Sequence, residues 1–178
     1  MNKINTENVV TLEVANKEEL PKFKKDLQES FAIAVIEEFG SLEDGPIPSD
    51  KDIDENFNKP GEIIYHITSN GKRVGGVIVS IDEETQHNSL DILFICKGEH
   101  SKDLGYKAWK AIEEKHPETK VWETHTPYFE KRNIHFYVNK CGFKIVEYLS
   151  ETYHHPHQEE DEGLPSGEDF FRFEKVMK

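Results

Sequence analysis

The sequence predicts a mixed α/β domain in which a mostly antiparallel sheet of six to seven strands is flanked by helices on both faces. Two observations carry this prediction. Strand patterns joined by short turns dominate the middle of the chain, and strand and helix patterns alternate after residue 87. Hairpins give antiparallel neighbours, whereas a strand-helix-strand unit gives a parallel pair, so the expected sheet is mixed.

The first sixty residues supply one strand and two helices. Residues 9–14 (VVTLEV) are typical of a strand. Asn16 and Glu19 have the spacing of a capping box, so a helix begins there, and its apolar positions keep a helical period to about Glu38. Residues 48–58 predict a short acidic helix.

Three consecutive strands follow. Residues 62–68 and 74–81 are apolar runs joined by a turn that contains Asn70 and Gly71, a strong hairpin signal. Residues 87–96 predict the third strand.

The last part of the chain alternates helices and strands. We expect a helix over 104–116, a strand over 121–126, a helix over 133–141, and strands over 143–150 and 169–176. The predicted order is therefore β-α-α-β-β-β-α-β-α-β-β.

Length and composition indicate one domain that spans residues 1–178. Apolar residues make up only 35% of the chain, but eleven phenylalanines and clear strand periodicity argue against disorder. The two cysteines, Cys96 and Cys141, fit a reduced protein. The N-terminus lacks the apolar run of a signal peptide, and no stretch is long enough to span a bilayer. We therefore expect a soluble cytoplasmic protein.

Charge excludes one class of partner. The net charge of −13 argues against nucleic acid, whose binding needs clustered Lys and Arg. Residues 151–169 carry seven acids and no Lys or Arg, whereas three lysines stand against Asp103 alone near the start of the helix over 104–116. This distribution suits an anionic cofactor and a cationic or neutral acceptor. Acidity that serves solubility alone is an equal alternative.

The loop between the strand over 87–96 and the helix that begins at Leu104 is a candidate phosphate site. A strand that leads into a helix N-terminus leaves backbone N–H groups and the positive end of the helix dipole free for an anion. Gly105 lies in the first turn, and Lys102 adds a positive charge. The alternative is an ordinary strand-to-helix turn.

The next helix carries a second motif. Asn133 and Tyr137 are four residues apart and project from one face, and residues 140–143 (KCGF) end the helix and start a strand. Together with the loop, this pattern resembles the GNAT superfamily, the GCN5-related N-acetyltransferases, most closely over residues 88–149. The resemblance implies a GNAT-like fold, acetyl-CoA as cosubstrate, and transfer of the acetyl group to a primary amine by direct attack.

The resemblance also implies the cofactor contacts. The family's loop pattern is Gln or Arg, two residues, Gly, one residue, then Gly or Ala; His100, Asp103 and Gly105 take these places. Asp103 departs from the family's glycine, and a helix-capping role is its alternative. Backbone N–H groups near Ile95 and Cys96 would polarise the thioester carbonyl. The expected contacts are Ile95, Cys96, His100, Ser101, Lys102, Asp103, Leu104, Gly105, Tyr106 and Asn133.

Tyr137 is the general acid that the resemblance implies. In the family, a tyrosine at this place protonates the thiolate of coenzyme A as the acetyl group leaves. A phenol of pKa ~10 can donate to a thiolate whose conjugate acid has a pKa of ~8–9. The alternative is that Phe136 and Tyr137 are core aromatic residues. Many members have an asparagine seven residues before the tyrosine, where this chain has Glu130.

Three side chains are candidates for the base that deprotonates the amine. The resemblance places this base on the central strands, where Asp91, Glu123 and His125 lie. Glu123 and His125 share a strand face, and we favour Glu123, followed by Asp91. For each, a solvated surface residue is the alternative.

The expected acceptor is a small-molecule or peptide amine, and the acidic segment 151–169 favours a cationic one. His154, His155 and His157 cannot easily close one tetrahedral site, so no metal is expected. A homodimer is an option, because many family members dimerise, and the oligomeric state stays open. The competing hypothesis is a catalytically weak GNAT-fold module that binds coenzyme A or a protein partner.

Overall fold

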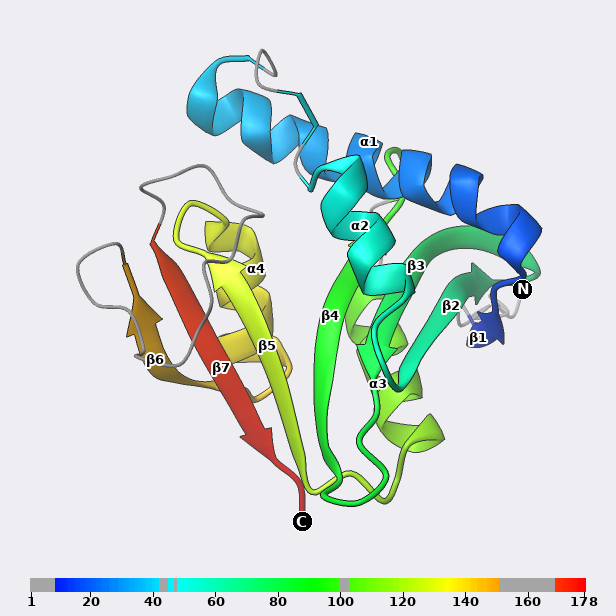
Figure 1. Cartoon of the computed structure of the whole chain (residues 1–178), viewed down its shortest axis with the longest axis vertical. Helices are drawn as coiled ribbons and strands as arrows, with labels where there is room; N and C mark the ends of the chain where they lie inside the picture. Colours follow the sequence, from blue (N-terminus) through cyan, green and yellow to red (C-terminus); the bar gives the residue numbers. More distant parts are fainter. Residues whose placement is uncertain (1–8, 42–44, 47, 100–102, 151–168) are drawn as a thin grey trace, which may run out of the picture.

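Seven strands form one sheet (Figure 1). The computed structural model describes residues 9–41, 45–46, 48–99, 103–150 and 169–178. The strands are β1 (Val10–Val14), β2 (Glu62–Ser69), β3 (Lys72–Ser80), β4 (His87–Ile95), β5 (Val121–Pro127), β6 (Lys144–Leu149) and β7 (Phe170–Val176). They lie in the order β1-β2-β3-β4-β5-β7-β6, and only β4 and β5 pair in parallel. The predicted mixed, mostly antiparallel sheet is confirmed.

Helices cover both faces of this sheet. They are the 3-10 helix η1 (Lys17–Glu19), α1 (Leu20–Phe39), α2 (Asp50–Phe57), α3 (Leu104–Lys115), α4 (Lys131–His135) and the π-helix η2 (Phe136–Lys140) that continues it. In Figure 1, α1 and α2 lie over one face, and α3 and α4 lie over the other. Among the described residues, no helix is both long and apolar enough to cross a membrane.

Local sequence signals set the ends of these elements. The capping box of Asn16 and Glu19 is formed at η1, directly before α1, and the Ser49 side chain caps α2. Asn70 and Gly71 adopt left-handed backbone conformations, with φ of 52° and 82°. Two left-handed residues make the tight turn that suits the twist of a β-hairpin, so β2 and β3 pair as predicted.

Two apolar clusters hold the helices on the sheet. The larger cluster includes Trp109 of α3 and Trp122 of β5, whose ring centroids lie 5.5 Å apart. The smaller cluster holds α1 and α2 on the opposite face through Phe23, Leu27 and Ile53. Burial of side chains of this size contributes about 1.5–3 kcal/mol each. Both helical layers are therefore held firmly against the sheet, and α1 can serve as a wall of a site.

The sheet opens between β4 and β5. These strands pair only near their beginnings, where residues 87–89 face residues 121–123, and Figure 1 shows them diverging beyond that point. β4 also has a bulge, because β3 pairs with Leu90 and Ile92 but skips Asp91. A bulge re-aims the side chains that follow it. The opening and the bulge together create space at the middle of the sheet.

Candidate active site

A cavity of about 790 Å³ lies where the end of β4 faces the starts of α3 and α4, with α1 as its outer wall. This volume is within the usual range of ligand pockets, ~300–1,000 Å³. Cys96 is not among the lining residues and instead packs against the apolar cluster beneath α1. The predicted contacts His100, Ser101 and Lys102 lie outside the described residues. The predicted contacts that line this cavity, the α3 cavity, are Ile95, Asp103, Leu104, Gly105, Tyr106 and Asn133.

Asp103 precedes α3 in a left-handed backbone conformation, with φ of 60° and ψ of 29°. Glycine adopts this conformation freely, and Asp is one of the few other residues that tolerate it. The GNAT pattern therefore has a physical reason for glycine here. The Asp103 side chain makes no capping hydrogen bond to α3, so the capping alternative is wrong. Its carboxylate instead pairs with the Nζ atom of Lys140, at 2.9 Å.

A second cavity, of about 520 Å³, lies between α2 and the diverging ends of β4 and β5. We call it the α2 cavity. Its charged lining is mainly acidic, since four carboxyl groups stand against the single ammonium group of Lys59. The four acids are Asp52, Glu55, Asp91 and Glu130. The α2 cavity is therefore suited to a cationic ligand.

The two cavities meet around Tyr137, which lines both of them and is only 6% exposed. Its ring packs against Phe143 and Phe173, with centroids 5.6 and 5.9 Å away. Burial raises the pKa of the Tyr137 phenol above its ordinary value, and a hydrogen bond with Thr124 opposes this rise. The hydroxyl therefore stays protonated and able to donate. Tyr137 is both a core aromatic residue and a residue of the cavity junction.

Asp91 reaches the α2 cavity from the bulge of β4. Its Oδ2 atom accepts a hydrogen bond from the Ser80 hydroxyl at 2.5 Å, and its Oδ1 atom lies 3.4 Å from the Nζ atom of Lys59. These two partners fix the carboxylate at the cavity wall. Of the two acids predicted as the base, Asp91 is the one that lines a cavity.

Two further carboxyl groups lie in this part of the molecule. The oxygens of Glu62 are buried and accept no hydrogen bond of ordinary geometry from the described residues. Burial raises the pKa of Glu62 to about 7, and the negative charge of Asp91 adds to the rise. Glu130 is buried, lines both cavities, and has its pKa raised by burial. The sequence signals are weak: Glu62 begins an ordinary strand, and Glu130 stands out only by replacing the family's asparagine.

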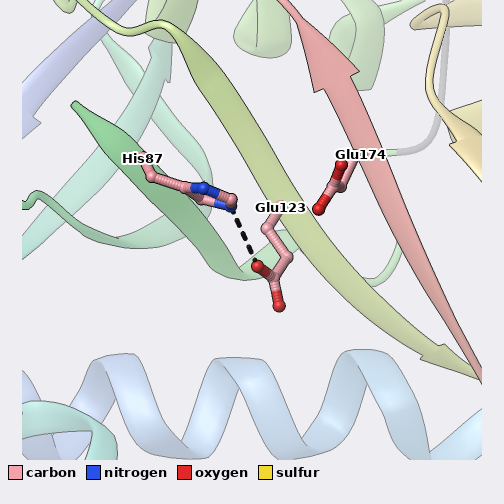
Figure 2. Close-up of side chains that lie close together, drawn as sticks. All are labelled: His87, Glu123 and Glu174. Atoms are coloured by element: carbon pink, nitrogen blue, oxygen red, sulfur yellow. Dashed lines mark hydrogen bonds and ion pairs between the residues drawn. The ribbon is translucent and has the colours of Figure 1, made fainter. Parts of the chain in front are cut away.

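Glu123 lies near the start of β5, in the part of the strand that pairs with β4. Figure 2 shows it in contact with His87, at 3.1 Å, with Glu174 beside the pair. His125 and Arg172 also approach its carboxylate, at 3.6 and 3.8 Å. Glu123 and His125 do share a strand face, but Glu123 lines neither cavity, whereas His125 lines the α2 cavity.

The His87, Glu123 and Glu174 side chains offer three ligand atoms within 4.8 Å of one another, the kind of cluster that can hold a metal ion. The Arg172 guanidinium lies among the same carboxylates, 2.5 Å from Glu174 and 3.8 Å from Glu123. Arg172 thus supplies the positive charge that a metal ion would otherwise provide. His154, His155 and His157 lie outside the described residues.

Comparison with known proteins assigns the chain to a family. The model of the acetyltransferase (GNAT) family matches residues 22–143, well over half of the chain. The chain belongs to the GNAT family. A Bacillus subtilis (strain 168) relative, described as "Uncharacterized protein YrkN", is 55% identical over 181 residues, which cover 99% of this chain and 98% of the relative.

Solved structures of GNAT acetyltransferases share the fold at low sequence identity. The IAA acetyltransferase from Bacillus cereus ATCC 14579 has a TM-score of 0.65 and 17% identity, over 95% of this chain and 100% of that one. The ribosomal-protein-S18-alanine N-acetyltransferase from Escherichia coli has a TM-score of 0.67 and 14% identity, over 94% of each chain. The spermidine N-acetyltransferase from Vibrio cholerae, in complex with CoA and spermine, has a TM-score of 0.65 and 14% identity, over 94% of this chain and 95% of that one. The predicted resemblance to the GNAT superfamily is thus confirmed.

Proposed function

We propose that this protein is an N-acetyltransferase that moves the acetyl group of acetyl-CoA to a primary amine by direct attack. The observation that carries the proposal is the meeting of two cavities at Tyr137, whose hydroxyl stays protonated. Such a junction lets two substrates enter from different sides and meet beside one hydrogen-bond donor. Membership of the GNAT family supports the same activity.

The α3 cavity is the proposed site of acetyl-CoA. The first turn of α3 presents free backbone N–H groups and the positive end of the helix dipole, which favour phosphate groups. Leu104 and Gly105 belong to this turn and line the cavity. Ile95, at the end of β4, would bring backbone N–H groups near the thioester carbonyl. Two solved relatives in the GNAT fold, one from Elizabethkingia anophelis and one from Bacillus subtilis, are described with acetyl-CoA and CoA bound, respectively.

The α2 cavity is the proposed site of the acceptor amine, and its acidic lining favours a cationic one. Asp91 is the proposed base, because it lines this cavity and its carboxylate is held by Ser80 and Lys59. Glu123 is a second candidate that would act through His125, which lies between it and the cavity. Solved relatives are named for both kinds of acceptor, spermidine and the ribosomal protein S18.

The reaction requires one bond to form and one to break. The neutral amine nitrogen attacks the thioester carbonyl, its surplus proton passes to Asp91, and the bond between carbon and sulfur breaks. Tyr137 donates its proton to the departing sulfur. Burial raises the pKa of the Tyr137 phenol, so the hydroxyl still holds its proton when the thiolate departs.

Calorimetric titration of the full chain with acetyl-CoA, and separately with free CoA, tests the proposed cofactor site. We expect saturable binding of both at micromolar concentration. No binding at millimolar ligand would contradict the proposal.

The free thiols of Cys96 and Cys141 fit the cytoplasm as the place of action. Analytical centrifugation at increasing protein concentration would show whether the chain forms a homodimer.

A second candidate function is a GNAT-fold module that binds coenzyme A but catalyses weakly. Asp103 in the place of a left-handed glycine and Glu130 in the place of the asparagine favour it, because both add negative charge beside an anionic ligand. This candidate predicts acetyl-CoA binding without amine-dependent release of thiol. A screen of mono-, di- and polyamines and of peptides with a free N-terminus separates the two functions.

A further inference from the structure

Asp103 and Lys140 form an ion pair at the wall of the α3 cavity. The two residues are 37 positions apart in sequence, one at the start of α3 and the other at the end of η2. Both line the cavity, and the carboxylate and ammonium groups lie 2.9 Å apart. The pair thus stands beside the helix N-terminus where the proposed diphosphate would lie.

Both side chains of this pair are exposed, so another anion can readily replace the Asp103 carboxylate at Lys140. The Lys140 side chain is 46% exposed and the Asp103 side chain is 63% exposed. An ion pair of this kind is favoured over its separated state by no more than about fivefold. A diphosphate carries more negative charge than one carboxylate and offers more acceptor oxygens, so it competes well for the ammonium group.

We propose that Lys140 binds the phosphate groups of acetyl-CoA, and that Asp103 holds Lys140 in the ligand-free protein and lowers cofactor affinity. The inference rests on the proposed function for the identity of the ligand. Binding moves the Lys140 ammonium from Asp103 to the phosphates and leaves the Asp103 carboxylate beside them. Asp103 thereby sets the cofactor affinity below the value that glycine or asparagine at this position would give.

Calorimetric titration with acetyl-CoA of four proteins tests the proposal: the wild type, Asp103→Asn, Lys140→Met and the double variant. Asparagine tolerates the left-handed conformation and removes only the charge. We expect Asp103→Asn to bind about three- to tenfold more tightly and Lys140→Met about three- to tenfold more weakly. The Asp103→Asn gain is expected to be smaller when Lys140 is already replaced, because no ammonium group is left to release.

Lys110→Met is the matched control. Lys110 is also 46% exposed and also belongs to an ion pair, with Glu113 at 3.6 Å, but it does not line the cavity. It changes the net charge by the same amount as Lys140→Met, and its affinity is expected to stay at the wild-type value. Pantetheine, which has no phosphate, is expected to bind all variants equally.

The outcomes separate this inference from the proposed function. If the wild type binds acetyl-CoA and the affinities of Lys140→Met and Lys110→Met are equal, the role of Lys140 is overturned and the proposed function stays intact. Weaker binding by Asp103→Asn would overturn the role of Asp103. Absence of acetyl-CoA binding by all the proteins would overturn both the inference and the function on which it rests.

Discussion

The two cavities differ in how the chain builds them. The predicted contacts of the α3 cavity come from one stretch of sequence, from the end of β4 through α3 to α4, where local spacing determines which residues meet. The α2 cavity gathers Lys59, Asp91 and His125 from three separate parts of the chain, and only the sheet brings them together. The difference teaches that one half of this site can be recognised from a motif, whereas the other half depends on strand register.

Loss of the Tyr137 hydroxyl tests the place where the two cavities join, and it is expected to have the largest effect. Tyr137→Phe should lower the turnover of amine acetylation by about 10²-fold, because a positioned acid contributes at least this much. Acetyl-CoA affinity should change little. Steady-state thiol release gives the rate, and calorimetry gives the affinity.

Tyr128→Phe is its matched control, because Tyr128 is 51% exposed and lines neither cavity. Turnover of Tyr137→Phe equal to that of Tyr128→Phe at every pH would remove Tyr137 from the mechanism and leave it a core aromatic residue.

Substitutions of Asp91 and Glu123 compare a carboxylate that lines the α2 cavity with one that does not. Asp91→Asn is expected to lower kcat by about tenfold to 10²-fold at neutral pH, since general base catalysis is lost. Glu123→Gln is expected to lower it by less than about threefold, as its carboxylate acts at most through His125. The pH dependence of kcat/KM for both variants checks this ranking.

The reverse ranking would show that Glu123 is the base. Full activity in both variants would move the role to Glu130, the other carboxyl group of the cavity junction.

The next prediction concerns the buried carboxyl group of Glu62 and its effect on folding stability. Burial raises its pKa from the ordinary 4.5 to about 7, so between these values the folded protein binds more protons than the unfolded chain. Folding stability therefore falls as the pH rises from about 4.5 to about 7, and the loss stays complete above that. Glu62→Gln is expected to raise the free energy of unfolding at pH 8 by about 1–3 kcal/mol and to have little effect at pH 4.

Urea unfolding of the two proteins at pH 4, 6 and 8 measures this difference. Glu118→Gln, at an exposed position, is the control and should change stability by less than about 0.5 kcal/mol at each pH. A Glu62→Gln effect independent of pH would show that Glu62 is charged to the same extent in the folded and unfolded states.

The smallest effect is expected at the rim of the α2 cavity. Glu55→Gln should raise KM for a diamine acceptor by about two- to threefold at low salt, with kcat unchanged, because an exposed charge attracts a cation only weakly. Asp54→Asn is the control, since Asp54 lies on the same helix but pairs with Lys24 and does not line the cavity. Equal KM values in 0.5 M salt and in low salt would contradict electrostatic attraction of the acceptor.

The fold and the α3 cavity could largely be predicted from the sequence, because their signals are local. The turn at Asn70 and Gly71 specified its own hairpin. The four-residue spacing of Asn133 and Tyr137 gave two side chains that line the same cavity. The widening of the helix into a π-helix over Phe136–Lys140 was not predicted, since its hydrogen bonding leaves no pattern in residue types.

The sequence could not show which of the candidate side chains line the α2 cavity, for a physical reason. Alternation along β5 correctly put Glu123 and His125 on one face, but alternation says nothing about depth along a strand. Glu123 falls where β4 and β5 still pair, and His125 falls where they have separated. The bulge at Asp91 breaks the alternation in β4, so the position of that carboxylate follows only from the three-dimensional register.

The most direct test of the central claim is release of free thiol from acetyl-CoA by the wild-type protein, measured with and without a panel of amines. The two cavities that meet at Tyr137 predict release that depends on the amine, saturates with it, and is fastest for a cationic acceptor. Mass spectrometry of the same mixtures should find the acetylated amine. Acetyl-CoA binding with no amine-dependent release from any member of the panel would contradict the proposed transferase and leave a GNAT-fold binding module.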